Sequence, residues 1–299
     1  MKQQHRAELA MVGVTVVWGS TFVLVKEALA DVSTMLFLAL RFSLAAVVLW
    51  VIYRKAVRAR SAGLSTLGPG AGAGVLLFAA YLLQTAGLKL TSPSKSAFIT
   101  GLSIPMVPLA SSLVYRIKPR LVEVAGILIA SFGMGLMTLP TGRLELSRGD
   151  FLSFLCAVTF ALHLVFMSHY TPVIGFESVS VLQVAVAAGL GLVAFPMAET
   201  VVFHPNFAVG SAVAVTGLFA TAFAFTTMSW AQQYTTATRT ALICALEPVV
   251  AWLTSWWLTG ESMPVRGQIG AVLILGGIIV VELRRPVRPE TIGEVTASI

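Results

Sequence analysis

The stretch 178–198, SVSVLQVAVAAGLGLVAFPMA, decides the fold class of this chain. It contains no Asp, Glu, Lys or Arg, and its length matches the about 20 apolar residues that a helix needs to cross the hydrocarbon core of a membrane. The stretches 70–89 and 209–230 are likewise uncharged over most of their length. We therefore expect membrane-spanning helices at all three places.

The composition extends this interpretation to the whole chain. Of the 299 residues, 57% are hydrophobic and 11% are charged, whereas a soluble domain carries roughly 25% charged residues. We predict an all-α integral membrane protein with ten transmembrane helices. The predicted spans are 9–28, 34–53, 70–89, 96–115, 121–140, 150–170, 178–198, 209–230, 239–259 and 266–283.

The positive charges indicate the orientation of the chain. If the N-terminus lies inside, 13 of the 20 Lys and Arg residues fall at interior ends of spans and six at exterior ends. An excess of Lys and Arg marks the cytoplasmic side, so we expect both termini in the cytoplasm. The net charge of +7 does not indicate a nucleic-acid partner, because such a partner needs basic residues clustered on one folded face.

An internal repeat relates the two halves of the sequence. An offset of 144 residues sets Thr91–Gly101 above Thr235–Ala245 with three identities and mostly conservative exchanges, and it carries Gly126 onto Gly270 and Gly133 onto Gly277. Each repeat holds five spans. Since five is odd, the second repeat enters the membrane from the opposite side. Inverted repeats of this kind are typical of secondary transporters, whose substrate site lies near the bilayer midplane.

Four short motifs carry a family resemblance: Trp18–Phe22 (WGSTF), Leu40–Phe42 (LRF), Ala245–Val249 (ALEPV) and Trp257–Glu261 (WLTGE). On these residues the chain resembles the EamA-like branch of the drug/metabolite transporter superfamily over about residues 7–284. One departure is that residues 103–105 read SIP where residues 246–248 read LEP, so the acidic residue is not duplicated.

The resemblance implies a ten-helix exporter of the bacterial inner membrane, with spans 1, 3, 4, 6, 8 and 9 around a central cavity and spans 5 and 10 at one end. It implies repeats at 7–142 and 148–284 and a cytoplasmic tail at 285–299. Members of this branch export amino acids, other metabolites and cationic drugs, and the chain is most similar to amino-acid exporters of the YddG type.

Two charged residues lie within predicted spans, where ions are expensive and by default face a cavity or a partner. Arg41 either recognises a substrate carboxylate or clamps carbonyls at a helix end. Glu247 precedes Pro248, which frees a backbone carbonyl. The Glu247 carboxylate either binds a substrate amine, carries a proton, or caps the loosened backbone in its protonated form.

Polar and aromatic residues that share helix faces are the candidate substrate-binding residues, because such faces suit a pocket that stacks and orients a side chain. The alternative is packing between helices. The candidates are Trp18, Phe22, Tyr81, Gln84, His163 and Trp230. The candidate hinge residues are Pro105, Pro108 and Pro248, which interrupt the fourth and ninth spans.

We expect a transporter that exports amino acids, including aromatic or other apolar ones, by alternating access. The sequence holds no GxxxxGK[ST] motif for ATP binding and no GxSxG or HExxH motif for catalysis. Cys156 and Cys244 lie in apolar stretches with no metal-ligand spacing. We therefore predict no catalytic residue, metal or cofactor. Export of cationic drugs is the alternative, and an intramembrane enzyme is the alternative from another class. A uniporter and a proton-coupled exchanger both fit the sequence.

Overall fold

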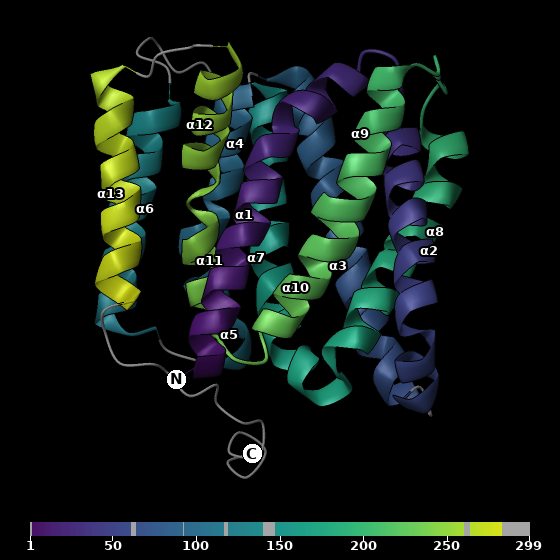
Figure 1. The fold of residues 1–299 in the computed structure, drawn as a ribbon, viewed down its shortest axis with the longest axis horizontal. Helices are drawn as coiled ribbons and strands as arrows, with labels where there is room; N and C mark the ends of the chain where they lie inside the picture. The colour runs from purple at the N-terminus through teal and green to yellow at the C-terminus, as the bar shows by residue number, and fades with distance from the viewer. Residues whose placement is uncertain are drawn as a thin grey trace.

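A computed structural model describes residues 2–60, 64–91, 93–116, 119–139, 147–259 and 264–282. These residues form a bundle of helices, drawn in Figure 1. Within the described ranges the only extended pairing is an isolated bridge between Val32 and Phe203. The helices are α1 (Lys2–Ala28), α2 (Thr34–Arg60), α3 (Leu64–Leu90), α4 (Pro93–Gly101), α5 (Ser103–Tyr115), α6 (Leu121–Thr138), α7 (Arg148–Ile174), α8 (Phe176–Ala198), α9 (Phe207–Gly217), the π-helical turn η1 (Leu218–Phe223), α10 (Ala224–Ala231), α11 (Ala237–Cys244), α12 (Glu247–Thr259) and α13 (Val265–Glu282).

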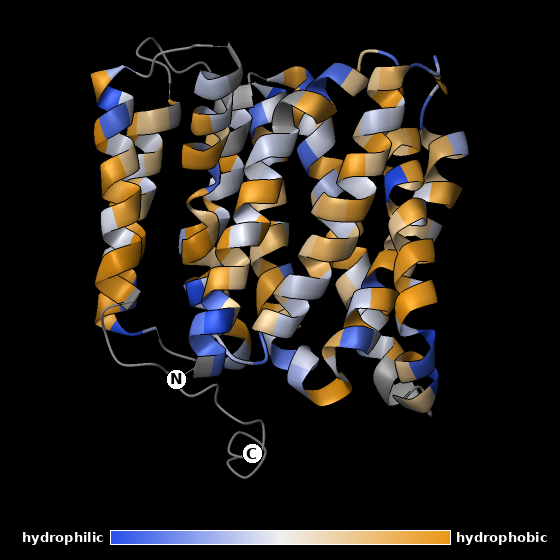
Figure 2. Ribbon diagram, viewed as in Figure 1, coloured by the Kyte–Doolittle hydropathy of each residue, from blue (hydrophilic) through white to orange (hydrophobic). Residues whose placement is uncertain are grey.

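The prediction of an all-helical membrane protein is confirmed. In the part of the chain that the structure describes, seven segments are long and apolar enough to cross a membrane, and 121–137 and 265–281 form shorter apolar helices. Figure 2 shows hydrophobic residues along the height of the bundle and hydrophilic ones gathered near its two ends. Nine of the ten predicted spans overlap these segments, whereas the span 239–259 falls on two short helices, α11 and α12. The number of ten crossings stays a prediction.

Two of the predicted spans are interrupted near their prolines. The helix breaks at Leu102 between α4 and α5, and at Ala245–Leu246 between α11 and α12. Pro105 lies in the first turn of α5 and Pro248 in the first turn of α12. Proline has no backbone N–H to donate, which costs nothing in a first turn but breaks a helix interior. Pro108 lies further inside α5. The predicted hinge role of these three prolines stays a prediction.

The helices α6 and α13 pack against each other along one side of the bundle, at the left in Figure 1. A methyl group added to Gly126 would lie 2.7 Å from the carbonyl oxygen of Gly277, and one added to Gly133 would lie 2.6 Å from that of Gly270. Only glycine allows the backbones this close approach. The order of the contacts also shows that the two helices are antiparallel.

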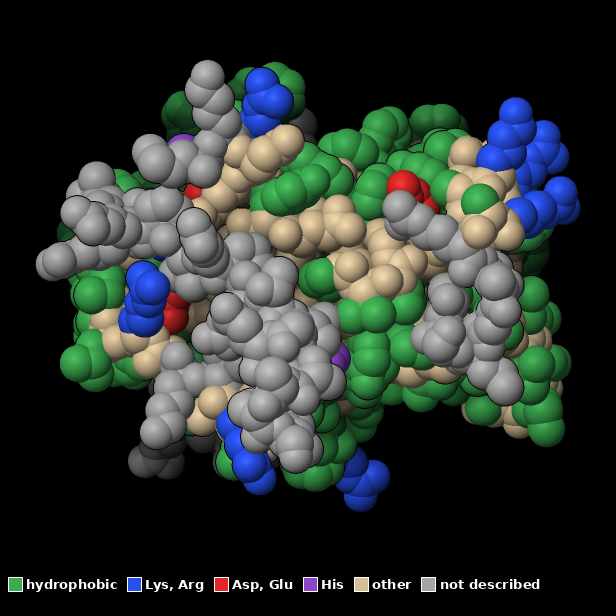
Figure 3. Space-filling view, turned by 90° about the horizontal axis from the view of Figure 1, so that it is seen from below, with side chains coloured by type: hydrophobic (Ala, Val, Ile, Leu, Met, Phe, Trp, Pro, Cys, Tyr) green, Lys and Arg blue, Asp and Glu red, His purple; other side chains and the backbone are tan. Residues whose placement is uncertain are grey.

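The other helices enclose the interior of the bundle. The helix α2 packs on α8, and α3 packs on both α7 and α8, while α1 contacts α10, α11 and α12. Figure 3 views the end of the bundle at which α1 begins and α2 ends, and Lys and Arg side chains project from its margins. Polar side chains of α1, α2 and α3 meet the turn η1 in the interior.

Candidate functional site

A π-helical turn lies in the middle of the segment formed by α9, η1 and α10. The backbone N–H of Ala224 donates to the carbonyl of Phe219, five residues earlier, and to that of Thr221. In a regular α-helix this N–H would bond to the carbonyl of Ala220. Turns of this kind occur often at functional sites. The Ala220 carbonyl accepts side-chain hydrogen bonds instead.

Arg41 of α2 donates hydrogen bonds to this turn. Its Nε donates to Thr221 Oγ1 over 2.7 Å. Its Nη2 donates to the Tyr81 hydroxyl over 3.2 Å and to the Ala220 carbonyl over 3.3 Å. The guanidinium carbon also lies 4.4 Å from the centre of the Tyr81 ring, within the range of a cation–π contact. Arg41 is 5% exposed, so its guanidinium is bonded mainly to the protein itself.

An aromatic cluster adjoins the turn. The Trp18 indole N–H donates to the Ala220 carbonyl over 2.9 Å. The ring of Phe225 lies 5.5 Å from Trp18 and 6.1 Å from Tyr81, and Phe160 lies 5.4 Å from Tyr81. The structure therefore brings the predicted residues Trp18 and Tyr81 together. It adds Phe225, which sequence reasoning missed although the 144-residue offset pairs it with Tyr81.

His163 lies beside this cluster in a buried polar chain. Its Nε2 lies 2.9 Å from Gln183 Oε1, and Gln183 Nε2 donates to Ser229 Oγ over 3.4 Å. Ser229 donates to the carbonyl of Phe225 over 2.6 Å. The His163 ring also contacts Phe225 edge-on at 6.0 Å. These hydrogen bonds link α7, α8 and α10. They favour a role of His163 in packing between helices over direct contact with a substrate.

Glu247 begins α12 in the interior and is half-buried. Its backbone carbonyl would lie 2.8 Å from a methyl group on Gly19, so the glycine of the WGSTF motif lets α1 approach α12 closely. Its carboxylate lies within electrostatic range of Tyr81, Cys156 and Cys244. Among the described residues this carboxylate has no hydrogen-bond or ion-pair partner, so it is available to a bound cation.

The remaining candidates are placed less closely. Gln84 is half-buried on α3, one turn beyond Tyr81. Trp230 is half-buried and contacts Tyr234 edge-on, with 5.5 Å between the ring centres. The side chain of Phe22 lies outside the described residues. No three His, Cys, Asp or Glu side chains gather as a metal site within the described ranges.

A buried ion pair joins α1 to α11 near the end of the bundle where α1 begins. Arg239 Nη1 lies 2.9 Å from Glu8 Oε1, and the two side chains are 3% and 8% exposed. Gln4 donates to the same Glu8 oxygen over 2.7 Å. The predicted spans place Glu8 one residue before the first apolar run, so sequence reasoning did not pair it with Arg239.

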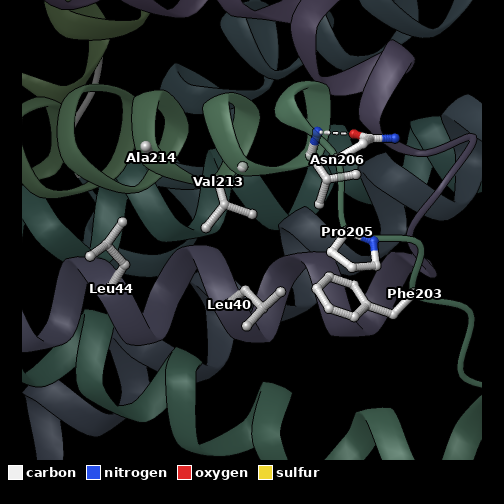
Figure 4. Close-up of a pocket in the computed structure, with 9 residues that line it drawn as sticks. Leu40, Leu44, Phe203, Pro205, Asn206, Val213 and Ala214 are labelled. Carbon is white, nitrogen blue, oxygen red and sulfur yellow. Dashed lines mark hydrogen bonds between the residues drawn. The ribbon is translucent and has the colours of Figure 1, made fainter.

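A cavity of about 330 Å³ opens between α2 and the start of α9 (Figure 4), and none of its lining residues belongs to the aromatic cluster. Its one strongly polar lining residue, Asn206, is already bonded: Oδ1 accepts from the Val209 N–H and Nδ2 donates to Asp31. An apolar cavity with no free polar group does not suit a polar substrate. Its lining consists of Leu40, Leu44, Phe203, Pro205, Asn206, Val209, Gly210, Val213 and Ala214.

Comparison with known proteins assigns the class. Residues 5–139 and 147–283 each match the EamA-like transporter family. An uncharacterized transporter of Archaeoglobus fulgidus is 30% identical over 278 residues, covering 93% of this chain and 86% of that protein. The uncharacterized transporter YyaM of Bacillus subtilis is 25% identical over 296 residues, covering 91% and 92%. This chain belongs to the EamA-like transporter family of the drug/metabolite transporter superfamily, and it is a multi-pass membrane protein.

The fold has a counterpart among solved structures. A protein crystal structure superposes with a TM-score of 0.74 at 22% identity, covering 93% of this chain and 98% of that one. At this level of identity the likeness concerns the fold alone.

Proposed function

We propose that this transporter exports amino acids with aromatic or other apolar side chains across the bacterial inner membrane, by alternating access and without chemical catalysis. The observation that carries the proposal is the aromatic cluster of Trp18, Tyr81 and Phe225, with the carboxylate of Glu247, unpaired among the described residues, within electrostatic range of Tyr81. Aromatic rings suit an apolar side chain, and a carboxylate suits an ammonium group.

A second candidate is export of aromatic organic cations. The observation that favours it is Arg41, whose Nε and Nη2 donors are engaged by Thr221, Tyr81 and Ala220 rather than left for a substrate carboxylate. A phosphorylated sugar fits less well, because it calls for several free Lys and Arg in the site. Of the described buried arginines, Arg239 is also bonded, to Glu8.

We further propose that the halves, 7–142 and 148–284, are inverted repeats of five crossings each. A shift of 144 residues carries Leu121–Thr138 of α6 onto Val265–Glu282 of α13, and it carries the starts of α4 and α5 onto those of α11 and α12. The glycine contacts support a two-fold relation: Gly126 meets the counterpart of Gly133, and Gly133 meets the counterpart of Gly126. A two-fold axis that relates antiparallel helices is perpendicular to them and therefore lies in the membrane plane.

For the orientation, we propose that the end at which α1 begins is cytoplasmic, together with the tail at 285–299. The described Lys and Arg residues favour this end: Arg6, Arg54, Lys55, Arg58, Arg116, Arg120 and Arg239 lie at it, against Lys26, Lys89, Arg148 and Arg266 at the other. We expect a periplasmic phosphatase fused after Ile299 to be inactive in cells that express it at normal levels. An active fusion would reverse the orientation or change the number of crossings.

Uptake into proteoliposomes tests the transport function. We expect the purified protein to carry labelled phenylalanine and leucine, and Trp18→Ala to lower the initial rate about fivefold per folded molecule, because about 1 kcal/mol of aromatic contact is lost. Phe223→Ala is the matched control, because Phe223 lies on the same segment as the cluster but is 49% exposed on its outer face.

Parallel assays separate the candidates. Runs with phenethylamine, which lacks the carboxylate, and with a phosphorylated sugar compare the substrate classes, and runs with and without a pH gradient detect proton coupling. Amino-acid uptake that is absent in the wild type, or equal in wild type and Trp18→Ala, would contradict the proposal.

A further inference from the structure

The π-turn η1 decides which face of α10 reaches the interior. A π-turn widens one turn of a helix, and each helical residue accounts for about 100° of rotation. Residues after η1 therefore face a different direction from the one that an uninterrupted α-helix would give them. In this structure Phe225, the second residue of α10, is 1% exposed and packs between Trp18 and Tyr81.

Side chains from two other helices hold this turn. The Trp18 indole of α1 and the Arg41 guanidinium of α2 both donate to the Ala220 carbonyl, and Arg41 also donates to Thr221. Ala220 and Thr221 are at most 1% exposed. A buried carbonyl without a partner is costly, so these donors stabilise the π-turn against rearrangement to a regular α-helix. The same bonds orient the indole of Trp18.

We propose that Arg41 is a positioning residue that fixes the π-turn, and that Phe225, placed by this turn opposite Trp18 and Tyr81, determines the preference for aromatic over aliphatic substrates. Phe225 is the only one of the three rings without a polar group, and it contacts both of the others. A planar substrate side chain that packs against this cluster would therefore meet the face or edge of the Phe225 ring. The consequence for transport rests on the proposed function, whereas the role of Arg41 in the turn does not.

The competing role for Arg41 is direct binding of a substrate carboxylate. The two roles differ in what they predict for an amine that lacks the carboxylate. If Arg41 binds the substrate carboxylate, replacing it lowers the transport of amino acids and leaves the transport of the amine unchanged. If Arg41 positions the turn, replacing it changes the ratio of aromatic to aliphatic transport for amino acids and amines alike, because the effect passes through the turn.

Four variants of the full-length protein separate these roles. Thr221→Val removes the hydroxyl that Arg41 holds, and Thr221→Ser keeps a hydroxyl and is the conservative rescue. Arg41→Lys keeps the charge but loses the planar fork that reaches three acceptors. Phe223→Leu is the matched control, because it changes a side chain of the same turn that points outward.

The first readout needs no substrate. The protein is labelled with 5-fluorotryptophan, and the ¹⁹F resonance of Trp18 is assigned by its loss in Trp18→Phe. We expect this resonance to move in Thr221→Val and Arg41→Lys and to stay at the wild-type position in Thr221→Ser and Phe223→Leu. The Thr221 variants keep the test valid if Arg41→Lys does not fold.

The second readout is transport in proteoliposomes of phenylalanine and leucine, and of phenethylamine and isopentylamine. We expect Phe225→Leu to lower the aromatic-to-aliphatic ratio about tenfold, and Thr221→Val to lower it in the same direction by a smaller factor, for both pairs. An unmoved Trp18 resonance in Thr221→Val overturns the positioning role. Loss of amino-acid transport with intact amine transport in Arg41→Lys overturns it in favour of carboxylate binding. If the wild type carries none of these compounds, the proposed function fails, and the ¹⁹F readout alone decides the role of Arg41.

Discussion

Replacing Glu8 by glutamine is expected to lower the free energy of unfolding by about 3–5 kcal/mol, the usual cost of leaving one charge of a buried ion pair without its partner. Arg239 is 3% exposed and lies 2.9 Å from the Glu8 carboxylate, so water cannot readily replace the lost charge. The measurement is denaturant-induced unfolding of the protein in detergent micelles, followed by circular dichroism.

Two further variants control this prediction. Glu27→Gln, an exposed position near the other end of α1, should leave stability almost unchanged. The double variant Glu8→Arg/Arg239→Glu restores opposite charges and should recover part of the loss. The single variants Glu8→Arg and Arg239→Glu complete the cycle. If their effects simply add in the double variant, the ion pair does not contribute in the way that its geometry indicates.

Replacing Glu247 by glutamine is expected to lower the transport of amine-bearing substrates roughly 30- to 150-fold. The physical reason is the loss of a hydrogen bond between charged groups, worth about 2–3 kcal/mol. Glutamine keeps the shape of the side chain, so the approach of Gly19 to the Glu247 backbone is preserved. The measurement is the initial rate of phenethylamine and phenylalanine uptake into proteoliposomes.

The same variant tests proton coupling. If Glu247 carries the coupled proton, a pH gradient that stimulates the wild type should no longer stimulate Glu247→Gln. Glu27→Gln serves again as the control for a change of charge at an exposed position. Uptake by Glu247→Gln at the wild-type rate would show that the substrate amine is bound elsewhere.

Much of the fold follows from patterns that the sequence displays directly. Apolar runs place the helices, since their length and composition alone decide insertion into a membrane. Pro105 and Pro248 lie next to the breaks that they predict, because a missing N–H has local effects. The paired glycines at a seven-residue spacing meet between α6 and α13, because small residues mark the closest helix contacts.

The interior was less predictable, because side-chain pairing depends on three-dimensional position. No sequence signal announces the π-turn, since Leu218–Phe223 reads as ordinary apolar helix. Because the turn cannot be predicted, the hydrogen-bond partners of Arg41 and Trp18 cannot be predicted either. The sequence singles out His163 as a polar group, but not its hydrogen-bond partner Gln183, whose Oε1 lies 2.9 Å from His163 Nε2. Phe225 could have been found, because the repeat offset sets it opposite Tyr81.

The packing of α6 on α13 has a consequence for the time course of biosynthesis. Between the end of α6 at Thr138 and the start of α13 at Val265 lie 126 residues. Ribosomes add roughly 5–20 residues per second, so about 6–25 s pass before the first residue of the partner helix exists. Throughout that interval the glycine face of α6 has only lipid or other helices against it. The contact between these two helices is therefore among the last to form. The first half of the chain is made before its partner helix in the second half exists.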